Sequence, residues 1–371
     1  MSTTIRKQFY VDDGGGGDDQ LDVAVELKLN LKKAMLRGGF HLCKWKANHP
    51  ALLEPEDGAS QPSVVEDKIL KILGILWNPL EDVFRFVMDM KKLRTPCQLV
   101  TVQSSLFDPC GFVSPFILIG RQIMQQATHK KRGWDSPLDL HILEEFFLWA
   151  SSIPLLANYP IPLWWNIDDM IGALDVSVQI FSDASTRGFG AVAYRRVVAL
   201  SGAIFVAFLL SKLRVIPLNA AKAGHNGSVP KMETSSNVIN IGLKTFLKKV
   251  LGNVCFVHWT DSECSLEMLQ NTGARYPLYY ANHLSKIHAA SFPDDWRHVD
   301  SASNPADFCS RGIWAEEAEK WSTFHRGPAF LWKPESEWPP IKDYLKSHGF
   351  SQCEGDGDPD PTSSSSSRRH L

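Results

Sequence analysis

A strand pattern that ends in an acid, within residues 178–194, constrains the fold of this chain more than any other feature. Its letters are VQIFSDASTRGFGAVAY, in which an apolar, β-favouring run reaches Asp183 and a second such run follows a short turn. Gly188 and Gly190 allow a tight reversal between the two runs. A carboxylate at the end of a buried strand is costly unless a partner binds it, although many turn aspartates bond only to their own backbone. The stretch predicts a strand–turn–strand unit and makes Asp183 a candidate ligand.

Three more acids follow Asp183 in a distinctive order. Glu233 lies in the first turns of a predicted helix, Asp261 ends a second buried strand, and Asp307 opens a later helix. The expected elements run strand–turn–strand–strand–helix–strand–helix–strand–helix. This order is that of a ribonuclease H fold, a mixed α/β sheet covered by helices.

Four carboxylates from separate elements suit a pair of divalent cations. Hydrolysis of a phosphodiester in such a site uses two ions about 4 Å apart, one activating water and one steadying the leaving oxygen. Mg²⁺ prefers oxygen ligands, so Asp and Glu fit where His or Cys would not. We expect Asp183 to bridge two Mg²⁺ or Mn²⁺ ions. The shells of these ions would be completed by Glu233, Asp261 and Asp307, although each acid taken singly is more often a cap or turn residue.

The composition describes an ordinary globular protein. The 371 residues suggest two or three domains, and 44% hydrophobic and 22% charged residues are usual proportions. The net charge of −2 provides no overall basic field, which argues against a tight, standing DNA binder. It leaves open an enzyme that holds nucleic acid through a local patch and metal ions.

Cysteines and apolar runs predict an intracellular protein without a membrane partner. The seven cysteines form no CxxC pair, which fits reduced thiols better than a disulfide framework. The N-terminus is polar and lacks the apolar core of a secretion signal. The longest apolar run, residues 202–210, is too short to span a bilayer.

Several motifs in the first third of the chain resemble one family. Tyr10-Val-Asp12-Asp13 resembles the YxDD box of reverse transcriptases, a hairpin whose acids hold magnesium. The letters GGFHLCKWKAN (38–48), ILGILWN (72–78) and SLFDPCGFVSP (105–115) follow it in order. Together with FSDAS, VPKME, WTDS and NPADF around the four acids, they resemble the Pol polyprotein of Pao/BEL-type LTR retrotransposons, a family also catalogued as Pao retrotransposon peptidase.

The resemblance implies a division of the chain. Residues 1–90 would be a truncated reverse-transcriptase palm, 91–170 thumb- and connection-like helices, and 171–320 a ribonuclease H-like domain. Residues 321–371 would be a tail, disordered from about 352 where Asp, Gly, Pro and Ser dominate. The overall class is therefore α/β and α+β.

The same resemblance limits the activities to expect. The chain starts at the YVDD box, without the earlier palm strand that supplies another aspartate, so Asp12 and Asp13 are expected to be a vestigial polymerase metal site. No Asp-Thr-Gly or Asp-Ser-Gly motif of an aspartic protease occurs. Two readings remain open: a nuclease acting on RNA–DNA hybrids, as a fragment of a longer Pol polyprotein, or an inactive remnant that at most binds nucleic acid or a protein.

Overall fold

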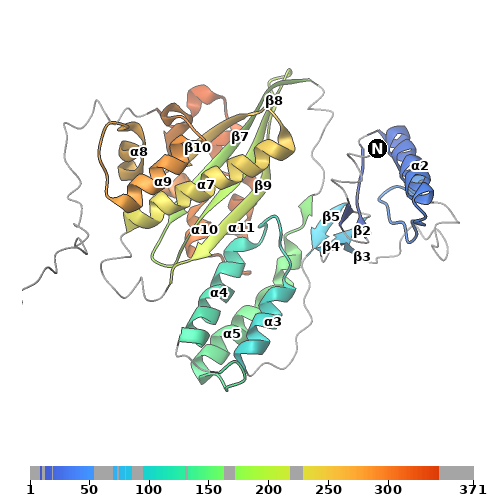
Figure 1. Ribbon diagram of the computed structural model, residues 1–371, viewed down its shortest axis with the longest axis horizontal. Helices are drawn as coiled ribbons and strands as arrows, with labels where there is room; N and C mark the ends of the chain where they lie inside the picture. The colour runs from blue at the N-terminus through green and yellow to red at the C-terminus, as the bar shows by residue number, and fades with distance from the viewer. Residues whose placement is uncertain are drawn as a thin grey trace, which may run out of the picture. The chain divides into compact units, whose positions relative to one another are not determined.

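A mixed sheet of five strands holds Asp183 near the end of one strand in the computed structural model, and Asp261 directly follows another strand (Figure 1). The strands lie in the order β11-β10-β7-β8-β9. β10 is parallel to both β7 and β11, whereas β8 and β9 form an antiparallel pair. The strands span Ala173–Ala184 (β7), Gly188–Ala199 (β8), Ile204–Val215 (β9), Cys255–Thr260 (β10) and Trp296–His298 (β11).

The structure describes ten stretches of the chain, and these form parts of two compact units. The described residues are 9–10, 13–18, 20–53, 70–72, 75–79, 81–85, 95–129, 133–162, 172–217 and 229–341. The first unit comprises residues 1–109, 131–173 and 314–316, and the second, which holds the five-stranded sheet, comprises 110–130, 174–313 and 317–371. The tail predicted to be disordered from about residue 352 lies outside the described residues.

The sheet topology follows from the length of the connections. A turn of three residues, 185–187, joins the neighbouring strands β7 and β8, as the glycines of the sequence predict. Parallel neighbours need long crossovers, and helices supply them. The helix α7 (Val229–Leu251) lies between β9 and β10 in the chain, and α8 (Glu263–Gln270) and α9 (Leu278–His288) lie between β10 and β11. The predicted mixed sheet of a ribonuclease H-like fold is confirmed.

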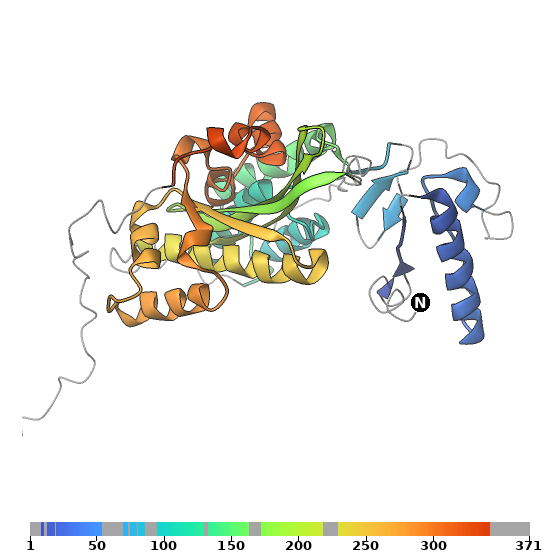
Figure 2. The same ribbon diagram turned by 90° about the horizontal axis from the view of Figure 1, so that it is seen from above.

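One face of the sheet packs against α7. Alternate residues of β7, Val178 and Ile180, point to this face, where they meet Ile239, Leu243 and Leu247 of the helix. All five side chains are buried. Figure 2 shows α7 and α9 together on this side of the sheet. The packing fixes the start of α7, and with it Glu233, relative to the strands.

The opposite face is covered by aromatic residues from the end of the described chain. Phe181 of β7 stacks on Trp259 of β10 with ring centroids 5.8 Å apart. Phe330 lies 5.0 Å from the Trp259 ring, and the Tyr194 hydroxyl donates a 2.6 Å hydrogen bond to the carbonyl of Phe324. The covering elements are α10 (Asp307–Arg311), α11 (Ala318–Arg326), η6 (Ala329–Trp332) and η7 (Glu335–Glu337).

Helix α4 (Ser114–His129) belongs to the sheet unit, although the sequence placed it in the thumb-like range 91–170. The Ser114 and Ser211 hydroxyls are 2.5 Å apart, and the Ser211 amide donates to the Cys110 carbonyl at 2.9 Å. An amphipathic pattern predicts that a helix packs on an apolar surface but not on which one. The two units therefore divide the chain differently from the predicted ranges, and the thumb assignment stays a prediction.

The other unit contains short strands and helices. The two-residue strands β1 (Phe9–Tyr10) and β2 (Asp13–Gly14) pair antiparallel, and the helix α2 follows them in the chain. This unit also contains a four-stranded sheet in the order β3-β4-β5-β6. These elements span Leu21–Arg37 (α2), Pro50–Leu52 (η1), Leu70–Ile72 (β3), Ile75–Asn78 (β4), Val83–Arg85 (β5), Ile161–Pro162 (β6), Pro96–Ser105 (α3), Leu140–Ser152 (α5) and Ile153–Asn158 (η3).

One segment of the described chain, Leu140–Asn158, is long and apolar enough to cross a membrane by length and composition. Its α-helical part, α5, has 13 residues, fewer than the roughly 20 that a spanning helix needs. Phe146 and Trp149 on this helix are buried within the protein. A core helix passes the same test, so the segment is weak evidence for a membrane span.

Candidate active site

The candidate acids come from the edge of the sheet where β7 and β10 end. These strands are parallel, and their register pairs Ser182 with Thr260. The residues that follow, Asp183 and Asp261, therefore leave the two strands at the same edge. Glu233 reaches this edge from the first turns of α7, because its carboxylate accepts a hydrogen bond from Ser262, the residue after Asp261.

Asp183 is the most strongly perturbed of the four acids. Its side chain is only 7% exposed. Burial, and then the charge of Asp261, raise its pKa from 3.8 to about 7, and the charge of Asp307 adds a smaller increase. Hydrogen bonds from Ser310 and from the Ala184 backbone lower this pKa but do not cancel the increase. A carboxyl with this pKa is only partly ionised at neutral pH, and a bound cation would favour its charged form.

Glu233 has a similar but weaker perturbation. Burial raises its pKa, the hydrogen bond from Ser262 lowers it, and the charge of Asp261 raises it. Asp261 thus acts on both Asp183 and Glu233. Its charge raises the pKa of both carboxyls, which agrees with the prediction that these acids lie near one another.

Asp307 is held by an arginine of its own helix. Arg311 Nε donates a hydrogen bond to Asp307 Oδ1, one turn along α10. The hydrogen bond and charge of Asp307 raise the pKa of the Arg311 guanidinium, burial opposes this, and the charges of Asp183 and Asp261 add to the increase. The Arg311 guanidinium therefore interacts with three of the four acids.

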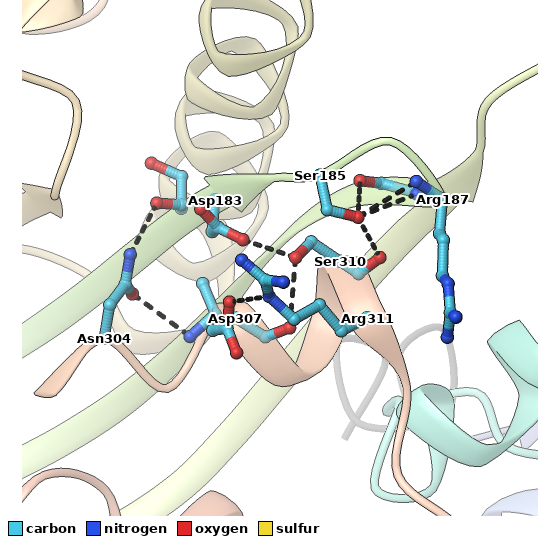
Figure 3. A network of polar contacts seen from close by, with 10 residues as sticks. Asp183, Ser185, Arg187, Asn304, Asp307, Ser310 and Arg311 are labelled. Atoms are coloured by element: carbon cyan, nitrogen blue, oxygen red, sulfur yellow. Dashed lines mark hydrogen bonds and ion pairs between the residues drawn. The ribbon is translucent and has the colours of Figure 1, made fainter. Parts of the chain in front are cut away.

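Serine and asparagine side chains position the acids (Figure 3). Ser310 donates to Asp183 Oδ2, and Ser185 in the β7–β8 turn donates to the Ser310 carbonyl at 2.7 Å. Asn304 donates to the Ser182 carbonyl at 3.2 Å and accepts from the Ala306 amide at 3.1 Å. These bonds tie α10 and the residues before it to the end of β7 and the turn that follows.

A buried polar layer lies directly behind Asp183. The Ser182 hydroxyl donates to Asn237 Oδ1 at 2.7 Å, and Asn240 donates to the Ile180 carbonyl at 3.0 Å. His258 Nδ1 lies 2.5 Å from Asn240 Oδ1, an acceptor, so Nδ1 carries the proton. Burial, and then the charge of Lys244, lower the pKa of His258 to about 3. The imidazole is neutral and acts as a structural donor.

The four acids fit a divalent cation by their chemistry, but they do not form a closed set of ligands as arranged here. Among the described residues, no group of three or more His, Cys, Asp or Glu side chains converges at a metal-sized site. The donors are all carboxylates, the ligands that Mg²⁺ and Mn²⁺ favour. Burial, and then the charge of Asp261, raise the pKa of Asp183, and a bound cation would oppose both effects. The metal site of Asp183, Glu233, Asp261 and Asp307 stays a prediction.

The residues that hold the acids were not singled out from the sequence. Ser262 caps the start of α8 directly after Asp261, and Asn304 and Ser310 lie three residues before and after Asp307. The spacing of Asp307 and Arg311, four apart on one helix, was the available signal for their ion pair.

The predicted polymerase remnant is only partly described. Asp12 lies outside the described residues, and Asp13 pairs with Tyr10 in the β1–β2 hairpin. Pairing of these strands agrees with the expected hairpin. The vestigial metal site of Asp12 and Asp13 stays a prediction.

Residues 95–262 match a family model described as "Pao retrotransposon-like RNaseH-like domain". The predicted resemblance to a Pao-type retrotransposon family is confirmed over these residues. The match includes Asp183, Glu233 and Asp261 and stops before Asp307. No curated protein matches the chain.

Similar solved structures include ribonuclease H domains and a viral reverse transcriptase. The N-terminal RNase H domain of Rv2228c from Mycobacterium tuberculosis is 13% identical, covers 40% of this chain and 96% of its own, and has a TM-score of 0.25. The foamy viral protease-reverse transcriptase in complex with double-stranded DNA is 12% identical, over 62% of this chain and 37% of its own, with a TM-score of 0.37. LC11-RNase H1 in complex with an RNA/DNA hybrid is 10% identical, over 36% of this chain and 93% of its own, with a TM-score of 0.23. Because these identities and TM-scores are low, the assignment of a ribonuclease H-like fold depends on the strand order and the family match.

Proposed function

Because residues 95–262 carry a Pao retrotransposon-like RNaseH-like domain, we propose that this chain is a Pol fragment with a metal-dependent nuclease. Its substrate would be the RNA strand of an RNA–DNA hybrid. The observation that carries the proposal is the position of Asp183, a buried acid at the ends of two parallel strands, close to the charges of Asp261 and Asp307. Buried acids of like charge cluster where a cation or a reaction requires them.

The protein would supply rigid carboxylates. Two bound cations would activate water and stabilise the leaving oxygen of the phosphodiester. Asp183, Glu233, Asp261 and Asp307 would hold them. Ser310 and Ser262 keep the Asp183 and Glu233 oxygens in place through hydrogen bonds from hydroxyl groups. These serines are positioning residues in the proposal.

The alternative of an inactive remnant has one observation in its favour. As arranged here, three of the acids have protein partners: Asp183 with Ser310, Glu233 with Ser262 and Asp307 with Arg311. A domain in which these pairs persist in the presence of metal would bind nucleic acid or protein without cutting. Polymerisation by this chain alone is not part of either proposal.

Hydrolysis of a labelled hybrid tests the nuclease. The full chain would be incubated with an RNA–DNA hybrid and Mg²⁺ or Mn²⁺, alongside Asp183→Asn and the surface control Asp294→Asn. We expect cleavage of the RNA strand by the wild type and the control, and a loss of at least about 100-fold in Asp183→Asn, in line with the size of electrostatic terms in active sites.

Two results would count against the nuclease. Absence of cleavage by folded wild-type protein supplied with metal would leave the inactive remnant. Equal cleavage by wild type and Asp183→Asn would show that the activity comes from elsewhere.

A further inference from the structure

Arg311 has a role that the acids alone do not define. It is the last residue of α10, and its Nε donates to Oδ1 of Asp307 at the first residue of the same helix. The Arg311 side chain is 65% exposed and that of Asp307 32%. In Figure 3 the guanidinium extends from α10 toward Asp183. It therefore lies at the solvent-facing side of the carboxylates.

The electrostatic surroundings of Arg311 extend beyond its ion pair. The charges of Asp183 and Asp261 also raise the pKa of its guanidinium, by less than Asp307 does. One positive charge thus offsets repulsion among acids that come from three different elements. A divalent cation bound by the same carboxylates would offset that repulsion more strongly, since it carries twice the charge and sits closer.

We propose that Arg311 is the internal counter-ion of this carboxylate group and that a divalent cation displaces it. Its guanidinium occupies an Asp307 oxygen before the cation binds, and it turns outward to a phosphate of the nucleic-acid backbone afterwards. The proposal rests on the proposed function, because the displacing ion is the cation of the nuclease.

The exposure of the ion pair makes displacement feasible. An exposed pair of this kind is weak because water and salt screen it, so a divalent ion can compete for the Asp307 oxygen. The released guanidinium would remain at the surface, where its planar donors match the oxygens of a phosphate.

The backbone at Arg311 restricts the motion to its side chain. Gly312, the next residue, has φ of +91°, and its amide donates to the Phe308 carbonyl at 2.9 Å. A Cβ at Gly312 would lie 2.8 Å from Ile119 of α4, so the end of α10 is packed tightly against that helix. Exchange of partners must occur by rotation about the bonds of the Arg311 side chain.

Calorimetric titration of the full chain with Mn²⁺, without nucleic acid, tests the displacement. The variants are Arg311→Gln and the matched control Arg187→Gln, which removes an equal charge from the adjacent β7–β8 turn. The Arg187 side chain points away from the acids in Figure 3. Without a competing guanidinium, we expect Arg311→Gln to bind Mn²⁺ roughly two- to fivefold tighter than wild type, the range that an exposed ion pair is worth. The control should change less.

Hybrid binding in Ca²⁺ gives the second measurement. Loss of one phosphate contact should lower the slope of log affinity against log salt by about one in Arg311→Gln relative to wild type. The predicted signature is tighter binding of the cation together with weaker, less salt-dependent binding of the hybrid.

The possible failures are distinguishable. Equal Mn²⁺ affinity of Arg311→Gln and wild type, with hybrid cleavage intact, would overturn the counter-ion role and leave the nuclease standing. Absence of Mn²⁺ binding in every variant would overturn both proposals. An unchanged salt slope would overturn the phosphate contact.

Discussion

The hydroxyl of Ser310 donates a hydrogen bond to the carboxylate of Asp183, which precedes it by 127 positions in the chain. The bond joins the last turn of α10 to the end of β7. It favours the charged form of the Asp183 carboxyl, whereas burial disfavours that form. The ionisation of Asp183 therefore depends on a residue of α10, the helix that also carries Asp307.

Ser310→Ala is expected to raise the pKa of Asp183 further. A hydrogen bond to a charged group is worth about 1.5–3 kcal/mol, which corresponds to roughly one or two pH units. Mn²⁺ affinity should fall at acid pH as the carboxyl is protonated. In Ser310→Ala the pH at which this fall occurs, measured calorimetrically between pH 5.5 and 8.5, should be higher than in wild type by at least about one unit. Ser301→Ala, at an exposed serine, is the control. The same pH dependence of Mn²⁺ affinity in Ser310→Ala and wild type would contradict the prediction.

Asp183→Asn is expected to stabilise the fold at alkaline pH in the absence of divalent ions. Because the folded pKa of about 7 lies above 3.8, the protonated acid favours the folded state below pH 3.8, and this contribution disappears as pH rises through 7. The difference corresponds to at most about 4 kcal/mol.

Urea unfolding of wild type and Asp183→Asn would measure this difference. The variant should gain stability relative to wild type from pH 5 to pH 8, and added Mn²⁺ should narrow the gap by stabilising the wild type. A pH-independent difference would show that Asp183 ionises normally in the folded chain.

His258 is expected to make the wild type sensitive to mild acid. Its folded pKa of about 3 lies below the ordinary 6.5, so stability is present above pH 6.5 and is lost as pH falls toward 3. Between pH 6.5 and 5 this loss amounts to about 2 kcal/mol. The free energy of unfolding of His258→Gln should lack this part of the pH dependence, and parallel curves for the two proteins would contradict the buried neutral imidazole.

Gly111→Ala is expected to destabilise the sheet unit far more than Gly202→Ala. Both glycines have positive φ, +76° and +84°. A Cβ at Gly111 would lie 2.3 Å from the Ser211 carbonyl oxygen, whereas a Cβ at Gly202 would meet nothing within 4 Å.

The Gly202 variant isolates the backbone cost, about 1–2 kcal/mol. In the Gly111 variant, the clash with Ser211 should add at least about 2 kcal/mol to the loss of unfolding free energy. Thermal unfolding measures both, and equal losses would show that the segment before α4 does not pack on β9.

Much of the sheet could be predicted from the sequence because its signals are local. The apolar runs that end at Asp183 and Asp261 and the short turn before Gly188 predict strands, and the structure contains them. Parallel pairing of β7 and β10 then brings the two acids to one edge. Periodicity and turn residues carry this information within a few residues of each element.

The remaining features depend on contacts that no local pattern encodes. The sequence predicts a helix over α4 but not its packing on β9 through Ser114 and Ser211. It also does not show that Arg196, an apparent surface charge, is buried with its guanidinium on the Leu331 and Lys333 carbonyls. Acceptors so distant in the chain become known only when the fold is known.

The bonds that Arg196 makes set the time at which this sheet can mature. Its acceptors at Leu331 and Lys333 follow it by 135 and 137 positions. At synthesis rates of about 5–20 residues per second, they leave the ribosome roughly 7 to 27 s later. A premature stop between Asp307 and Leu331 would yield all four acids but leave the guanidinium of Arg196 without these carbonyls. Translation must pass well beyond the last predicted metal ligand before Arg196 can complete these hydrogen bonds.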